Sequence, residues 1–118
     1  MNLRTLDRGQ WQYYFDLISK VAPGQKLELE VAGLDIGDQI EEEWVSLIGL
    51  SYEPKGDVLT VLTESMDHAI EHPKDIVVAE DGIRVAFVAI ADLENHVQIL
   101  RFRQPLLLQE PADVLPIR

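Results

Sequence analysis

The most constraining feature of the sequence is a pair of short apolar segments, 44–52 and 57–63, joined by a four-residue turn at 53–56. Pro54 presets the backbone φ angle at the first central turn position. Gly56 can take the left-handed conformation that often follows a type I turn. Segments joined this tightly pair as antiparallel neighbours, so the sequence predicts a β-hairpin here.

Alternation of apolar and polar residues predicts further strands elsewhere in the chain. In segment 26–34, apolar side chains at every second position are separated by glutamates, as in a strand with one buried face. Segments 76–79 and 83–91 form a second predicted hairpin around residues 80–82, and a turn at 92–95 leads into a strand at 97–103.

A helix is predicted at residues 7–21, where Trp11, Tyr14, Phe15 and Ile18 fall on one face. Thr5 or Asp7 is positioned to cap its start, and Pro23-Gly24 ends it. A second, short helix is predicted at residues 65–71, capped by Ser65 and stopped by Pro73.

Together these elements predict an α+β fold, with an antiparallel sheet of about six strands and the N-terminal helix packed on one face. We expect one domain over residues 1–108 and an extended tail over 109–118. One helix about 22 Å long cannot cover a sheet roughly 29 Å wide. Segment 83–91 is also apolar on both faces. The sheet therefore curls on itself, is covered by the short helix and tail, or packs against a second copy as a homodimer.

Composition narrows the classes of function. The 118 residues include 21 Asp and Glu against 10 Lys and Arg, a net charge of −11, and no cysteine. The negative charge disfavours nucleic acid and anionic membranes as partners. The absence of cysteine excludes disulfides and thiol chemistry. Because the first eight residues lack an apolar signal stretch, we expect a cytoplasmic protein. The glycines form no phosphate-binding loop, and we expect no cofactor.

Four stretches of the chain, 4–8, 44–59, 67–73 and 98–106, resemble a family of small bacterial proteins classed only as a domain of unknown function. The resemblance extends over most of the chain, to about Leu108. It implies a compact bacterial domain. No activity is attached to the family, so the resemblance assigns no catalytic residue.

The densest group of titratable residues suggests a metal site. Asp67, His68 and His72 are the candidate ligands, because two histidines at i and i+4 of a helix can share a divalent metal with a carboxylate. Pro73 disfavours helical geometry at His72, however, so the two imidazoles need not face the same way. The alternative interpretation is a capped turn with solvated charges.

Three other groups have simpler interpretations. Asp35, Asp38 and the glutamates at 41–43 do not match the spacing of a calcium-binding loop. Asp57 is expected to close the turn at 53–56 by accepting from backbone amides. Arg101 and the arginine two residues later face the same side of a strand, where they either clamp an anion or bridge to nearby glutamates.

The leading functional hypothesis is a non-enzymatic protein-interaction or dimerisation module, based on the apolar strand faces and the absence of nucleophile or phosphate-loop motifs. The alternative is a small-ligand or divalent-metal-binding protein centred on residues 67–75. An enzyme that uses scattered carboxylates and histidine is a third hypothesis. A buried polar pocket containing His68 would favour the second or third.

Overall fold

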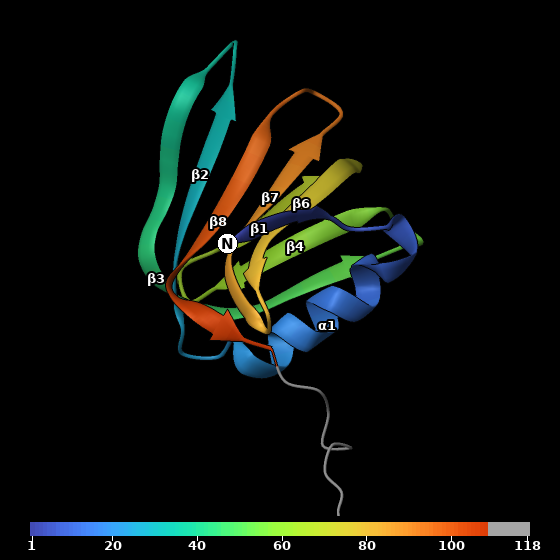
Figure 1. Cartoon of the computed structure of the whole chain (residues 1–118). Coiled ribbons are helices and arrows are strands. Elements are labelled where there is room, and N and C mark those ends of the chain that lie inside the picture. Colours follow the sequence, from blue (N-terminus) through green and yellow to red (C-terminus); the bar gives the residue numbers. More distant parts are fainter. Residues whose placement is uncertain (109–118) are drawn as a thin grey trace, which may run out of the picture.

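The computed structural model describes residues 1–108 and confirms the predicted α+β class (Figure 1). A 3-10 turn, η1 (Arg8–Gln10), leads directly into the helix α1 (Trp11–Val21). Neighbouring strands of the single sheet are antiparallel, in the order β1-β6-β7-β8-β2-β3-β4-β5. Its eight strands are β1 (Asn2–Thr5), β2 (Lys26–Gly33), β3 (Gly37–Glu53), β4 (Val58–Thr63), β5 (Asp67–Glu71), β6 (Pro73–Asp81), β7 (Arg84–Asp92) and β8 (Val97–Leu107).

The sheet has eight strands among the described residues rather than about six. The first extra strand, β1, is short and fully exposed, and it pairs only with β6. Several strands are also longer than predicted: β3 starts at Gly37, and β8 continues through Pro105 to Leu107. The predicted tail, 109–118, lies outside the described residues.

The predicted short helix at 65–71 is wrong, because residues 67–71 form the second extra strand, β5, and residues 65 and 66 belong to the turn before it. The Oγ1 atom of Thr63 accepts hydrogen bonds from the backbone amides of Ser65 and Met66, at 3.2 and 3.1 Å. These bonds make a tight turn that sends the chain back along β4. Pairing with β4 buries Ile70, and this tertiary gain outweighs the weak local preference of a five-residue segment.

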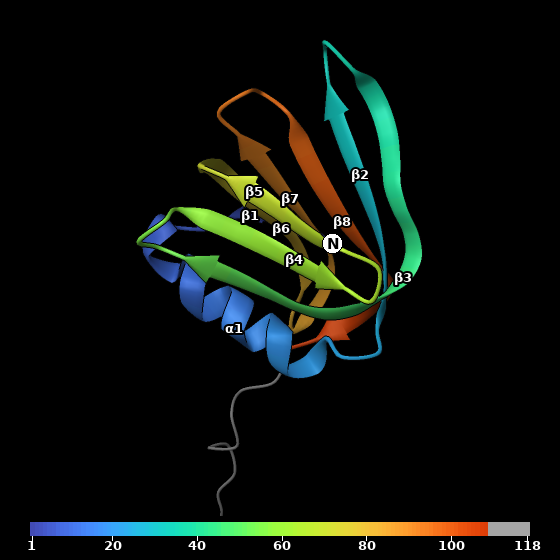
Figure 2. The same ribbon diagram turned by 180° about the vertical axis from the view of Figure 1, so that it is seen from behind.

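A bend in β3 divides the sheet into two layers. The first half of β3 pairs with β2 and its second half pairs with β4. The pairing register between β2 and β3 shifts between Leu27 and Leu29 of β2. The shift leaves a bulge on β3, in which Trp44 has a positive φ of 52°. The larger layer is β1, β6, β7, β8, β2 and the start of β3; the smaller layer is the end of β3, β4 and β5 (Figures 1 and 2). The sheet thus curls, and the layers cover each other.

The helix α1 closes one end of this curled sheet and packs mainly on β3 (Figure 2). Its buried face contains the four residues predicted from the sequence, together with Leu17. The Ser19 hydroxyl both donates to the backbone oxygen of Leu50 and accepts from its amide. This pair of bonds fixes the helix against β3. The contact lies next to Gly49, where the pairing register between β3 and β4 shifts. Within residues 1–108 no helix is long and apolar enough to span a membrane.

The interior is apolar next to α1 and becomes polar at the opposite end. On β8 the inward-facing residues run from Phe102 and Leu100 to Gln98, and on β7 they run from Val88 and Ile90 to Asp92. The change from apolar to polar residues occurs on neighbouring strands at the same end of the molecule. This end of the interior therefore holds the candidate site.

Candidate functional site

The three predicted metal ligands lie on or directly after a strand rather than on one helix. Successive side chains alternate across a strand, so Asp67 is exposed while His68 points between the layers. His72 follows β5 and has a positive φ of 54° at the single-residue connection to β6. The i, i+4 helical geometry behind the metal prediction is therefore absent. No group of three or more potential ligands within residues 1–108 is arranged to hold a metal ion.

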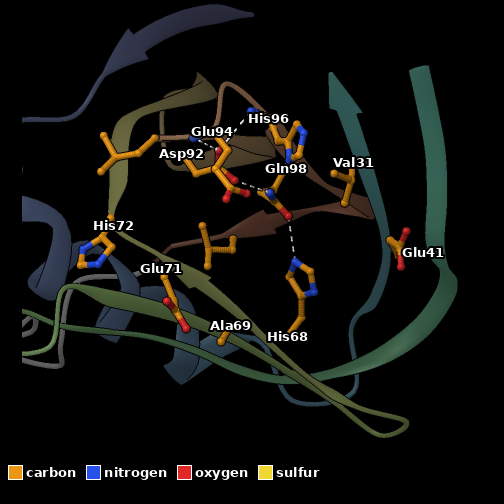
Figure 3. Close-up of a pocket in the computed structure, with 12 residues that line it drawn as sticks. Val31, Glu41, His68, Ala69, Glu71, His72, Asp92, Glu94, His96 and Gln98 are labelled. Carbon is orange, nitrogen blue, oxygen red and sulfur yellow. Dashed lines mark hydrogen bonds between the residues drawn. The ribbon is translucent and has the colours of Figure 1, made fainter. Parts of the chain in front are cut away.

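His68 instead lines a cavity of about 530 Å³ between β5 and the ends of β7 and β8 (Figure 3). The cavity volume lies within the range typical of small-molecule sites. All three histidines of the chain contribute to its walls. The lining residues are Val31, Glu41, His68, Ala69, Ile70, Glu71, His72, Asp92, Leu93, Glu94, His96 and Gln98.

A relay of hydrogen bonds crosses the cavity between the two layers. Nε2 of Gln98 donates to Oδ2 of Asp92 at 3.1 Å, and Oε1 of Gln98 lies 2.8 Å from Nε2 of His68 (Figure 3). Because an ionised carboxylate only accepts, Asp92 fixes the orientation of the Gln98 amide. The amide oxygen in turn requires a proton on Nε2 of His68. Neutral His68 therefore keeps Nδ1 as an acceptor.

Asp92 is the anchor of this relay. It is only 9% exposed, and its Oδ1 accepts from the backbone amides of Glu94 and His96 at 2.9 and 3.0 Å. The same carboxylate thus shapes the β7–β8 turn and orients Gln98, which is 5% exposed. The relay is built into the turn, so its geometry exists before any ligand binds.

The second cavity histidine, His72, belongs to a cluster of polar and charged side chains formed with Asp57, Tyr52 and Arg8. Its Nδ1 lies 3.3 Å from Oδ2 of Asp57, whose other oxygen accepts from the Tyr52 hydroxyl at 2.6 Å and from Arg8 at 3.1 Å. Arg8 also donates to the backbone oxygen of Pro73 at 3.0 Å. These bonds hold the β5–β6 connection in place.

The position of Asp57 corrects a sequence prediction. The glutamate at position 53, rather than Asp57, accepts from the turn amides of Lys55 and Gly56. The left-handed residue is Asp57, with a φ of 55°, and not Gly56. Its carboxylate is thereby available to the cluster. The Tyr52 hydroxyl, followed by His72 and Arg8, holds the pKa of Asp57 below its usual value.

The third cavity histidine, His96, is paired with the tip of the β2–β3 hairpin. Its Nε2 lies 2.9 Å from Oδ1 of Asp35, and this hydrogen bond raises the pKa of His96 and lowers that of Asp35. Asp35 is thus held by His96 at the tip of the β2–β3 hairpin. Arg101 similarly bridges Glu28 and Glu30 on β2, as one of its sequence interpretations expected.

Sequence reasoning identified His68 and His72 but missed Asp92, His96 and Gln98. An aspartate at the first position of a predicted turn was an available signal, because such residues commonly accept hydrogen bonds from the amides that follow. Nothing in the local sequence connects Gln98 with His68, thirty residues earlier. Only the curl of the sheet brings them together.

The fold and the cavity define a small α+β domain in which a polar pocket opens between the two layers of a curled antiparallel sheet. Residues 2–111 match the model of DUF5335, a family of unknown function, and the chain belongs to this family. An uncharacterized protein of Aquifex aeolicus (strain VF5) is 40% identical over 111 residues, which cover 93% of this chain and all of the relative. No solved structure matches the chain.

Proposed function

We propose that this domain is a small-molecule-binding module whose binding site is the cavity between β5 and the β7–β8 turn. The observation that carries the proposal is the relay from Asp92 through Gln98 to His68 at the cavity wall. Buried polar side chains contribute only modest net stability even when their hydrogen bonds are satisfied, and apolar residues of similar shape at these inward positions are often as stabilising or more so. A preorganised polar wall in an otherwise apolar interior is typical of a ligand site.

This proposal develops the sequence hypothesis of a small-ligand protein centred on residues 67–75. Strand β5 and His72 supply one wall of the cavity, as that hypothesis requires. The opposite wall comes from residues 92–98. The site therefore extends over both layers of the sheet, and a bound ligand would contact segments that are far apart in sequence.

A fragment screen by amide NMR tests the proposal. We expect at least one fragment to shift the amide signals of residues 68–72 and 92–98 together. The Gln98→Leu variant should weaken that response about tenfold, because it removes the group that orients His68. Gln104→Leu, an exposed change on the same strand, serves as the matched control. A folded protein with no cavity response to a diverse screen would contradict the proposal.

A second candidate function, self-association, is favoured by exposed apolar residues at a separate hollow. Tyr13 on α1 and Ile83 in the β6–β7 turn are each 56% exposed and line a 240 Å³ hollow beside β1. In the described structure β1 pairs on one side only, and a free strand edge can pair with another chain. Apolar side chains beside such an edge are typical of contact surfaces.

Light scattering after size-exclusion chromatography tests self-association. We expect a dimer at micromolar concentration, converted to monomer by Ile83→Glu, because a buried unpaired carboxylate opposes association. Leu34→Glu is the control, since Leu34 lies fully exposed at the tip of the β2–β3 hairpin, outside that hollow. A wild-type monomer at this concentration would exclude the dimer as a stable state.

A further inference from the structure

We propose that the ligand of the cavity is an organic cation, specifically a small aliphatic amine. This inference rests on the proposed function and adds the chemical class of the ligand. It is based on the donor and acceptor pattern of the walls, on the spread of their charges and on the apolar surface between them.

The cavity walls are mainly acidic, and the imidazoles of His72 and His96 already face the carboxylates of Asp57 and Asp35. Four carboxylates, from Glu41, Glu71, Asp92 and Glu94, line the cavity, and no lysine or arginine is among its lining residues within 1–108. Three of these side chains are exposed at the rim, whereas Asp92 is buried at the wall. Like charges around a concave surface raise the local concentration of cations and repel anions. An anionic ligand is thereby disfavoured.

The relay adds a second, independent constraint on the ligand. Because Asp92 fixes the Gln98 amide and thus the proton on Nε2 of His68, neutral His68 has only Nδ1 left for a further partner. That atom accepts hydrogen bonds. Ionised carboxylates also only accept. The cavity wall is therefore rich in acceptors, and it is complementary to a ligand rich in N–H donors, such as an ammonium group.

The spacing of the acidic groups favours an organic cation over a bare metal ion. No three or more carboxylate or imidazole groups within the described part of the chain converge on one point, as a divalent metal requires. The carboxylates are instead spread around a volume of about 530 Å³. A diamine can carry its charges on separate atoms and so reach two such groups together.

Apolar surface lies between the charged groups of the wall. Val31, Ala69, Ile70 and Leu93 all line the cavity. Methylene groups of an aliphatic amine can contact this surface, which adds favourable burial to the charge interactions. A strongly hydrated inorganic ion gains nothing from such contacts. The combination of acidic rim and apolar wall therefore matches an alkyl ammonium compound.

Three isosteric probes test the charge requirement by calorimetry and amide NMR. Putrescine, 1,4-butanediol and succinate have similar lengths but present two cationic, neutral or anionic ends. We expect putrescine to bind with its shifts confined to the cavity residues, and at least about tenfold more tightly than the diol, because only the diamine gains the ionic contacts. Succinate should not bind. Nα-acetyl-lysine amide should bind more weakly than putrescine, since it carries one positive charge instead of two; tighter binding would point to a lysine side chain as the ligand and overturn the free-amine proposal.

Charge variants separate cavity binding from general attraction to an acidic protein. Glu71→Gln combined with Glu94→Gln should weaken putrescine binding about three- to tenfold. Asp16→Asn combined with Asp81→Asn removes the same net charge from exposed positions outside the cavity and should leave binding unchanged. Equal weakening by both pairs, or shifts spread over the whole surface, would overturn the proposal.

Other outcomes distinguish failure of the ligand class from failure of the binding function. If butanediol or succinate shifts the cavity signals as strongly as putrescine, the cavity binds ligands but the cation assignment is wrong. If zinc alone shifts His68 and His72 and putrescine does not, the metal hypothesis replaces the amine. If none of these probes and no fragment in the screen perturbs the cavity signals of the folded protein, both proposals are wrong.

Discussion

Replacing Phe15 by alanine is expected to destabilise the domain by about 3–5 kcal/mol, the usual cost of removing a fully buried aromatic side chain. Phe15 has no exposed surface and lies on the face of α1 that closes the curled sheet. A domain of this size has a total stability of about 5–15 kcal/mol. We therefore expect the melting temperature, followed by circular dichroism, to fall by at least about 10 °C.

Gln12→Ala provides the control for this prediction on the same helix. Gln12 is exposed and lies outside the hollow lined by Tyr13 and Ile83, so its removal should change stability by no more than about 0.5 kcal/mol. Similar losses from the two variants would indicate that α1 does not pack on β3 as described. A small loss from Phe15→Ala alone would show that the helix contributes little to the core.

The buried face of α1 could be predicted because it depends only on the spacing of apolar residues within the helix. The spacing of Trp11, Tyr14, Phe15 and Ile18 defines one helical face regardless of what covers it, and all four are buried. The start of the helix was less well predicted. Neither Thr5 nor Asp7 caps α1, because a 3-10 turn intervenes and Asp7 makes no side-chain capping bond.

The strands that were missed or misassigned depend on partners distant in sequence. The four residues of β1 show no clear alternation and are exposed, and they are held in place by pairing with β6 more than seventy residues later. Segment 67–71 has no strong local preference, and pairing with the neighbouring strand β4 together with the burial of Ile70 makes an extended form favourable. The pattern of residues within one strand carries no information about these pairing contacts with other strands.

The curl of the sheet explains why the site was only half predicted. The excess of apolar residues on segment 83–91 predicted burial on both faces, but only Val85, Val88 and Ile90 are buried, and the other apolar residues of the strand are half-buried. The sequence had left three ways of covering the sheet. The bulge at Trp44 selects the first, since it turns β3 from one layer into the other. His68 and Gln98 meet only after that turn, so their hydrogen bond has no signature in either local sequence.

The second large effect is expected from Asp92→Ala, which should cost about 2–4 kcal/mol, because hydrogen bonds to a charged group each contribute about 1.5–3 kcal/mol and are not additive. The variant leaves the amides of Glu94 and His96 and the Gln98 side chain without their acceptor. Chemical denaturation measures the loss. Asp81→Ala, at the exposed end of β6, should change stability by no more than about 0.5 kcal/mol, and an equal loss there would contradict the anchoring role of Asp92.

Asp92→Asn tests the direction of the relay with little change in shape. The new side-chain oxygen can still accept from the two turn amides, but its NH₂ group then faces Nε2 of Gln98, which is also a donor. Gln98 should therefore rotate its amide and present NH₂ to His68, whose Nε2 must then accept. Nitrogen-15 NMR of the neutral imidazole is expected to show a proton on Nε2 of His68 in the wild type and on Nδ1 in Asp92→Asn. The same tautomer in both proteins would mean that Asp92 does not set the state of His68.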